Sequence, residues 1–319
     1  MPPEQAGRIV TAPGAPRLPR VIGRIAASDE KFALRLQKLV GTADPDYHRR
    51  AEDFFRRYDT FIQSQGRSFE FGIDCFIRLQ RSVEEQRQQF LKTGRYANTS
   101  FEEVNRNVYS NAEIMEYHMH GLVFAQFLWP DQYRRFQFFC ERFPGYAAGI
   151  RRYLEIGGGH ALYVTEAARV LAPKVPLEVV DISPTSIQMA QGIAQEPRIE
   201  YHLMNVFDFS DGPVYDFITM GEVLEHVEDP QALLSKLRRL LTPGGRVYLT
   251  TPANAPMVDH IYLFQNAQEI RDMIHLCGFA IEAEVKQYAV DLPDRRAEQM
   301  KIPLMYGAFL SVPDKKSPA

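Results

Sequence analysis

An acidic residue followed by small residues at alternate positions is the pattern in this chain that most directly indicates chemistry. It comes straight after an apolar run, residues 153–156, that reads as a short buried strand. Glycines at such a turn allow φ > 0 and let a ligand approach the backbone. The first N–H groups of a following helix would point at the same place, although many α/β proteins use such a turn without a ligand. The pattern consists of Glu155, Gly157, Gly159 and Ala161.

A carboxylate follows about 20 residues later, where a nucleotide-binding fold places the acid that accepts hydrogen bonds from ribose hydroxyls. It is Asp181, at the end of a second apolar run over residues 177–181. The fingerprint for nicotinamide cofactors would also have a third glycine, at the position that Leu162 occupies here. The two patterns together predict a nucleoside-containing ligand and argue against NAD.

Five motifs in a fixed order resemble those of the class I S-adenosylmethionine (SAM) dependent methyltransferases, over roughly residues 150–312. The run Leu224-Glu-His-Val227 is similar to the branch that includes ubiquinone-pathway O-methyltransferases and many natural-product enzymes. Each motif alone is common, whereas the five in this order are specific. They are Leu154-Glu-Ile-Gly-Gly-Gly159, Val180-Asp-Ile-Ser183, Asn205-Val-Phe-Asp208, the segment 215–227 and the segment 241–249.

Apolar runs alternate with helical patterns from residue 153 onward, which predicts an α/β fold with a mostly parallel sheet covered on both faces. The resemblance implies a Rossmann-like sheet of seven strands with the last one antiparallel. Ligands should then lie at the carboxyl ends of the strands. The expected strands are 153–156, 177–181, 199–204, 215–220, 245–251 and a closing hairpin of 280–288 and 304–312, with helices near 160–171, 184–194, 230–241 and 267–277.

The resemblance also implies which residues bind SAM and, as product, S-adenosylhomocysteine. Glu155 and the glycine turn would flank the methionine part, Asp181 would hold the ribose, and Ile182 would lie against the adenine. Asn205 would reach the adenine amino group, with Asp208 as an alternative for that contact. The full predicted set is Glu155, Gly157, Gly158, Gly159, Asp181, Ile182, Asn205, Val206, Gly221 and Glu222.

Three histidines are candidates for the acid–base group that methyl transfer needs when the acceptor must lose a proton of high pKa. His226 follows the fourth strand, His260 follows the fifth, and His118 lies on a predicted helix before the first strand. Asp259 could orient His260, although adjacent side chains usually point apart. Each histidine could instead serve packing or capping. Catalysis by positioning alone remains the alternative.

No metal site is expected. The cysteines Cys75, Cys140 and Cys277 are far apart in the sequence. His118 and His120 are two positions apart on a predicted helix and therefore do not share a face.

Residues 29–148 read as helices and predict a lid, substrate or oligomerisation domain, which could support a homodimer. Residues 1–28 would be a disordered leader, 149–314 the SAM-binding catalytic domain and 315–319 a tail. The segment Tyr117 to Trp129 leads toward the first strand, so it could form a wall of the substrate pocket.

Bulk properties exclude several classes of function. A net charge of −3 gives no electrostatic reason to expect nucleic-acid binding, and pairs such as Arg134-Arg135 read as solvated helix faces. No apolar run of membrane-spanning length is seen, and neither a signal peptide nor a disulfide framework is indicated. We therefore expect a cytoplasmic protein that acts without a membrane.

The sequence thus predicts a SAM-dependent methyltransferase acting on a small molecule such as a secondary metabolite, a sugar or a quinone-like acceptor. Natural-product biosynthesis is a plausible setting. A peptide or protein acceptor is the enzymatic alternative, and an inactive scaffold with the SAM fold is the alternative from another class. The residues do not say whether oxygen, nitrogen or carbon is methylated.

Overall fold

The computed structural model of the chain describes residues 16–209, 212 and 214–313. The described chain separates into two compact units, one up to Arg56 and one from Arg57 onward. The sequence placed the boundary between a helical domain and the SAM-binding domain at residues 148 and 149, and that boundary stays a prediction. The predicted tail, 315–319, lies outside the described residues.

The first unit is helical. It contains α1 (Arg17–Ala26), α2 (Glu30–Thr42) and the start of α3 (Pro45–Ser64). The prediction of a disordered leader over 1–28 is wrong for α1, while residues 1–15 lie outside the described residues. The helix forms because its apolar residues recur at intervals of three and four, on one face. These buried residues are Leu18, Val21, Ile22 and Ile25.

The second unit begins with helices and continues into the sheet domain. Serine and asparagine caps start several of these helices, as Ser68 does when its side chain accepts a hydrogen bond from the N–H of Phe71. Pro130 opens the last long helix before the sheet, a position that proline favours. The elements are α4 (Phe69–Thr93), α5 (Phe101–Val104), a π-helical turn (Asn105–Tyr109), α6 (Ala112–Leu128) and α7 (Pro130–Arg142).

A seven-stranded sheet forms the core of the second unit, in the order β3-β2-β1-β4-β5-β7-β6. Within the described part of the chain, only β7 runs antiparallel to its neighbours, as the family resemblance implied. The strand order reverses between β1 and β4, so the carboxyl ends of these two strands border the edge where α/β sheets bind ligands. The strands are β1 (Tyr153–Ile156), β2 (Leu177–Asp181), β3 (Ile199–Leu203), β4 (Tyr215–Gly221), β5 (Leu241–Ala253), β6 (Ala280–Tyr288) and β7 (Leu304–Ser311).

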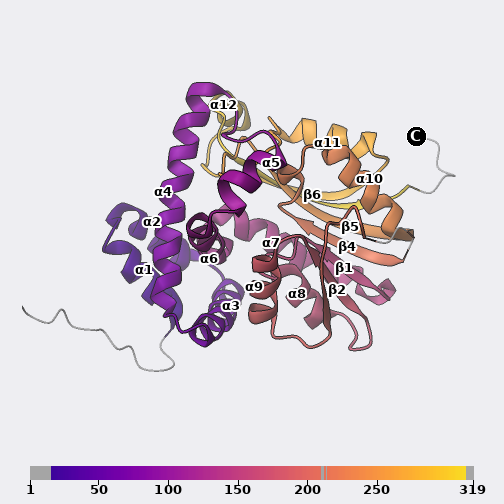
Figure 1. The fold of residues 1–319 in the computed structure, drawn as a ribbon, viewed down its shortest axis with the longest axis horizontal. Coiled ribbons are helices and arrows are strands. Elements are labelled where there is room, and N and C mark those ends of the chain that lie inside the picture. The colour runs from indigo at the N-terminus through magenta and orange to yellow at the C-terminus, as the bar shows by residue number, and fades with distance from the viewer. Residues whose placement is uncertain (1–15, 210–211, 213, 314–319) are drawn as a thin grey trace, which may run out of the picture. The chain divides into compact units, whose positions relative to one another are not determined.

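Helices cover both faces of this sheet, as Figure 1 shows. α7, α8 (Leu162–Val170) and α9 (Pro184–Ala194) pack on one face. α10 (Pro230–Leu240) and α11 (Ala267–Leu276) pack on the other. The short α12 (Asp294–Gln299) lies between β6 and β7 in the chain. Because both faces are covered, the central strands read as continuous apolar runs.

Among the described residues, the helices are too short or too polar for any of them to cross a lipid bilayer.

Candidate functional site

The glycine turn after β1 has the conformation that its sequence predicted. Gly157 has φ +72°, Gly159 has φ +45°, and Ala161 adopts φ +57° just before α8. A Cβ at Gly157 would lie 2.4 Å from Val223 Cγ2, so internal packing also requires glycine there. A Cβ at Gly159 would meet only a backbone oxygen, at 3.9 Å, among the described residues. The turn is therefore open at position 159, where a ligand can approach.

Glu155 links the turn to the following helix. Its buried carboxylate accepts a hydrogen bond from the N–H of Val164, with Oε2 and N 2.5 Å apart. Burial raises the pKa of Glu155 well above its ordinary value. The contact satisfies an N–H in the first turn of α8 that would otherwise lack a partner. Glu155 thus has a structural role in shaping the predicted SAM turn.

Asp181 lies against the same turn. Its Oδ1 accepts a hydrogen bond of 2.8 Å from the N–H of Ser183. Burial raises the pKa of Asp181, while N–H groups of Ser183, Gly159 and Gly158 partly offset this effect. The structure therefore brings the predicted ribose acid and the glycine turn together.

An exposed apolar surface follows the tips of β2 and β3. Ile182, the predicted adenine contact, is 50% exposed. Leu203 pairs in register with Asp181 and is 53% exposed, and Met204 and Phe207 are also exposed. Large apolar side chains gathered at one edge of a sheet are a common mark of a ligand surface.

The other predicted adenine residues divide between this surface and the core. Asn205 is exposed, and its side-chain oxygen accepts a hydrogen bond of 3.0 Å from the N–H of Phe207. Val206 is partly buried and packs against the hydrophobic core that α10 and α11 form with the sheet. Asp208 is exposed.

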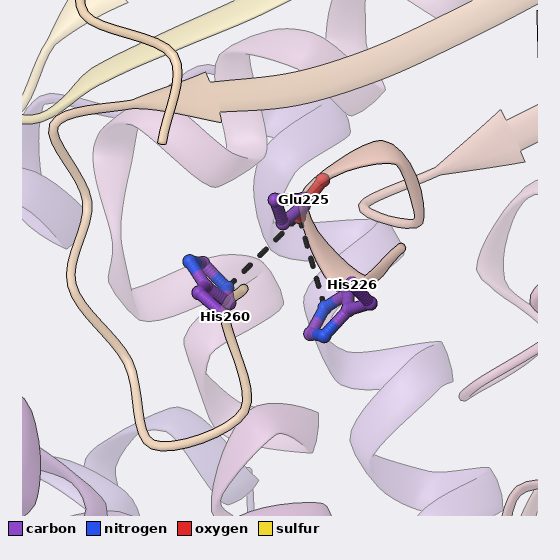
Figure 2. A group of neighbouring side chains, drawn as sticks. All are labelled: Glu225, His226 and His260. Atoms are coloured by element: carbon purple, nitrogen blue, oxygen red, sulfur yellow. Dashed lines mark ion pairs between the residues drawn. The ribbon is translucent and has the colours of Figure 1, made fainter. Parts of the chain in front are cut away.

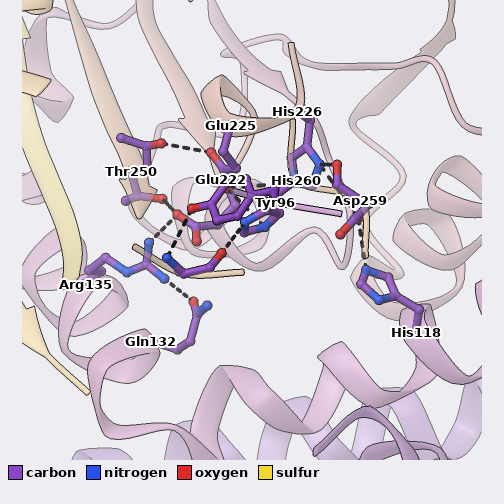
Figure 3. A network of polar contacts seen from close by, with 12 residues as sticks. Tyr96, His118, Gln132, Arg135, Glu222, Glu225, His226, Thr250, Asp259 and His260 are labelled. Carbon is purple, nitrogen blue, oxygen red and sulfur yellow. Dashed lines mark hydrogen bonds and ion pairs between the residues drawn. The ribbon is translucent and has the colours of Figure 1, made fainter. Parts of the chain in front are cut away.

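The end of β4 carries an ion pair with a buried arginine, which sequence reasoning missed. Glu222 has φ +56°, and its carboxylate contacts the guanidinium of Arg135 and the hydroxyl of Thr250 (Figure 3). Arg135 is 1% exposed, so its predicted place on a solvated face is wrong. Burial opposes charge on the guanidinium, but the Glu222 carboxylate raises the pKa of Arg135 above its ordinary value. The adjacent Gly221 leaves room for the ring of Tyr163. A Cβ added at Gly221 would lie 2.8 Å from Tyr163 Cε2.

The three candidate histidines converge on one cluster of charged groups, shown in Figure 3. His118 Nε2 on α6 lies 3.1 Å from Asp259 Oδ2, and His226 Nδ1 lies 2.9 Å from the carbonyl oxygen of Asp259. Burial opposes ionisation of Asp259, yet His118 and His226 lower its pKa well below the ordinary value. Asp259 therefore contacts His118 and His226. The idea that its carboxylate orients His260 is wrong.

His260 takes a different partner. Its Nδ1 lies 2.7 Å from the carbonyl oxygen of Ala255, and its Nε2 faces Glu225. Burial and the nearby His226 lower the pKa of His260 to about 4. The pKa of His226 is raised instead, because the carboxylates of Asp259 and Glu225 outweigh its burial. Burial and the charge of Glu222 raise the pKa of Glu225 to about 8.

Tyr109 is a further neighbour that the sequence did not single out. It ends the π-helical turn, a feature often found at functional sites. Burial and the charges of Asp259, Asp181 and Glu225 raise the pKa of its phenol well above the ordinary value. Tyr109 thus lies near both the ribose acid and the histidine cluster.

The two ends of the predicted pocket wall, Tyr117 to Trp129, have different surroundings. The first part of α6 reaches the site, since His118 contacts Asp259 and the carbonyl of Met119 contacts His160 Nε2 at 2.9 Å. At the other end, Trp129 Nε1 donates a hydrogen bond of 2.7 Å to Gln80 on α4. The indole therefore has a packing role among the helices.

Comparison with known families gives one match that covers more than half of the chain. The profile described as "Methyltransferase domain" matches residues 124–288. An ubiquinone biosynthesis O-methyltransferase of Xanthomonas oryzae pv. oryzae is 31% identical over 109 residues, which are 33% of this chain and 44% of that protein. One of the same name from Alkalilimnicola ehrlichii is 35% identical over 105 residues, 32% of this chain and 41% of that protein. The chain thus spans less than half the length of these relatives.

Solved structures with a similar fold have low sequence identity. The N-methyltransferase NodS from Bradyrhizobium japonicum, in complex with S-adenosyl-L-homocysteine, is 19% identical, with a TM-score of 0.44 over 58% of this chain and 89% of that one. The mitomycin 7-O-methyltransferase MmcR is 13% identical, with a TM-score of 0.49 over 73% of this chain and 68% of that one.

Proposed function

The chain belongs to the methyltransferase domain family, as its motifs predicted, and we propose that it transfers the methyl group of SAM to a small-molecule acceptor. The observation that carries this proposal is the position of Asp181 against the open glycine turn at the switch point of the sheet. SAM supplies a methyl group already activated by its sulfonium. The protein therefore needs chiefly to hold donor and acceptor in line.

The residues at this edge fit the parts of the donor. The turn at Gly157 to Gly159 would receive the amino-acid tail, Asp181 the ribose, and the exposed Ile182 the adenine face. The ion pair of Glu222 with Arg135 fixes the end of β4 beside them. These assignments remain proposals for SAM binding.

The histidine cluster supports an acceptor site next to the donor. The side chain of His226 is 22% exposed, whereas His118 is 2% exposed and His260 is 5% exposed. His226 is thus the member that an acceptor reaches most readily, while Asp259 and His118 hold it in place. The names of the relatives suggest phenolic or quinol acceptors as the first compounds to test.

Three alanine variants, at His226, His260 and His118, test the acceptor site. We expect turnover with labelled SAM to fall by at least about tenfold for His226→Ala, as for loss of a proton-transfer group, with SAM affinity retained. A normal rate for all three variants would mean that the cluster takes no part in transfer. A loss of SAM affinity would place the histidine in the donor site instead.

A further inference from the structure

We propose that Glu225, His226 and His260 form a binding site for a divalent transition-metal ion of the zinc class. Figure 2 shows the three side chains directed toward one another. Their ligand atoms all lie within 4.8 Å of one another. The site contains none of the residues assigned to SAM, but it shares His226 and His260 with the proposed acceptor site. With an ion bound, Nε2 of His226 would be a metal ligand and not a free base. Metal binding is measured without turnover, so its test does not depend on the proposed methyl transfer.

The hydrogen bonds of the two histidines fix which ring nitrogen faces the centre. His226 Nδ1 contacts the carbonyl oxygen of Asp259, and His260 Nδ1 contacts that of Ala255. A carbonyl oxygen only accepts, so each Nδ1 must carry the hydrogen. Each neutral ring then presents the lone pair of Nε2 to the centre of the cluster. Metal-binding histidines usually hold their other N–H in this way.

Glu225 supplies a third acceptor at the same point. Its side chain is 0% exposed, and Oε2 accepts a hydrogen bond of 2.9 Å from the hydroxyl of Thr251. Among the described residues, no hydrogen-bond donor reaches the buried Oε1. This oxygen lies 3.8 Å from His226 Nε2 and 4.0 Å from His260 Nε2. Three acceptor lone pairs, on Oε1 and on the two Nε2 atoms, thus face one point without a donor between them. A buried acceptor without a hydrogen-bond partner costs free energy, so a proton or a cation must lie among them.

The three ligand atoms lie farther apart than in a bound zinc site, so the cluster must contract around a cation. Zinc binds imidazole nitrogen at roughly 2.0–2.1 Å, which gives a tetrahedral edge of about 3.4 Å. The backbone holds the two ligand segments in place, since the N–H groups of Ile261 and Tyr262 donate to the carbonyl oxygen of Glu225 at 2.8 and 2.9 Å. Two edges of the cluster, at 3.8 and 4.0 Å, are about half an ångström longer than that tetrahedral edge. The ligand atoms of the two histidines lie within 4.8 Å of each other, so the ligands must draw together when an ion binds.

The ligand types narrow the choice of ion. Two imidazoles and one carboxylate suit Zn²⁺, Co²⁺ or Ni²⁺ better than Mg²⁺ or Ca²⁺, which favour oxygen ligands. Three protein ligands leave a position for water or an acceptor oxygen, as in catalytic zinc sites. Sequence reasoning missed the site because His260 comes from a different loop than the adjacent Glu225 and His226.

Titration of the full-length, metal-stripped protein with Co²⁺ tests the proposal, followed by visible absorption and calorimetry. We expect one bound ion per chain, with absorption bands typical of four or five ligands. Glu225→Gln, which keeps the shape of the side chain, and His260→Ala should each weaken binding by at least about tenfold. Circular dichroism shows whether each variant is folded, and if His260→Ala is not, Glu225→Gln decides.

His275→Ala is the matched control. His275 Nδ1 also contacts a carbonyl oxygen, that of Phe279 at 3.1 Å, but the residue is exposed on α11. Cobalt affinity should be unchanged in this variant. The proposal is overturned if the wild-type protein binds no cobalt, which would mean that a proton on Glu225 holds the cluster together. Equal binding by wild type and Glu225→Gln would overturn it as well. Binding of S-adenosylhomocysteine, measured separately, tests the methyltransferase proposal.

Discussion

At the scale of single residues, the candidate site contains ionisable side chains whose pKa values are shifted by burial and by neighbouring charges. Asp181 and the glycine turn were predicted from spacing because a local motif places both. Arg135 was not, because its partner Glu222 lies far along the chain and nothing in the local sequence marks a buried arginine. The three histidines were predicted singly, whereas their meeting around Asp259 and Glu225 appears only in the folded protein.

Asp181→Ala should weaken SAM binding. The substitution removes charge-assisted hydrogen bonds worth about 1.5–3 kcal/mol, which corresponds to roughly 10- to 150-fold in affinity. Calorimetry with the wild type, the variant and Asp272→Ala, an exposed residue of α11, makes the comparison. Equal affinity for wild type and Asp181→Ala would remove Asp181 from the donor site.

Arg135→Met should destabilise the protein by about 2–4 kcal/mol, because it leaves the Glu222 carboxylate without its buried partner. Adding Glu222→Gln should recover part of that loss, since no charge is then left unpaired. Denaturant unfolding of the single and double variants measures both effects. A double variant no more stable than Arg135→Met would show that the ion pair is not the cause.

At the scale of elements, the helical region is held by close packing and buried aromatic rings. Such packing could not be predicted from the sequence. The spacing of apolar residues shows which face of a helix is buried, but it does not show which other element packs against that face. The strands from β1 onward could be predicted, since β1 and β2 are short, largely apolar runs and β6 alternates apolar with polar residues, and β2 has the predicted bounds. β5 extends beyond its predicted bounds, 245–251, at both ends, because Leu241 pairs with Tyr215 of β4 and pairing with β7 continues to Ala253.

Gly121→Ala should lower stability by about 1–3 kcal/mol. A Cβ at Gly121 of α6 would lie 2.9 Å from Leu79 Cβ and 3.0 Å from the carbonyl oxygen of Cys75, both on α4. Gly23→Ala in α1 is the control, because among the described residues nothing lies within 4 Å of the added Cβ. That change should raise stability by roughly 0.5–1 kcal/mol. Thermal unfolding of both variants tests the expected opposite signs.

His120 should make the helical region sensitive to acid. It packs beside Phe71, and Tyr58 Oη lies 2.9 Å from its Nδ1. Burial, with His160 nearby, lowers its pKa from 6.5 to about 4. The unfolded chain therefore binds a proton between these pH values that the folded protein does not. The contribution of His120 to the free energy of unfolding is complete above pH 6.5 and is lost as the pH falls toward 4. We expect the free energy of unfolding to drop by about 2 kcal/mol between pH 7 and pH 5.

His120→Gln, which cannot take up a proton, should reduce this dependence on pH. Free energies of unfolding at several pH values between 7 and 5 provide the measurement. The same slope in wild type and variant would show that His120 does not cause the acid sensitivity.

At the scale of the whole molecule, a sheet with one reversed strand places the ends of β1, β2 and β4 at one edge, and the proposed donor residues lie there. The order of motifs was enough to predict this fold, because each strand and turn carries a local signal. The path of the helices before β1 was not predictable, since no motif links them to the site. The homodimer, the cytoplasmic location and the nature of the acceptor stay predictions.

Calorimetric titration of the full-length protein with S-adenosylhomocysteine and SAM tests the central claim most directly. The account predicts one binding site per chain for each compound, with affinity that falls in Asp181→Ala and is kept in Asp272→Ala. A folded wild-type protein that binds neither compound would contradict the account and favour a scaffold that has only the shape of a methyltransferase.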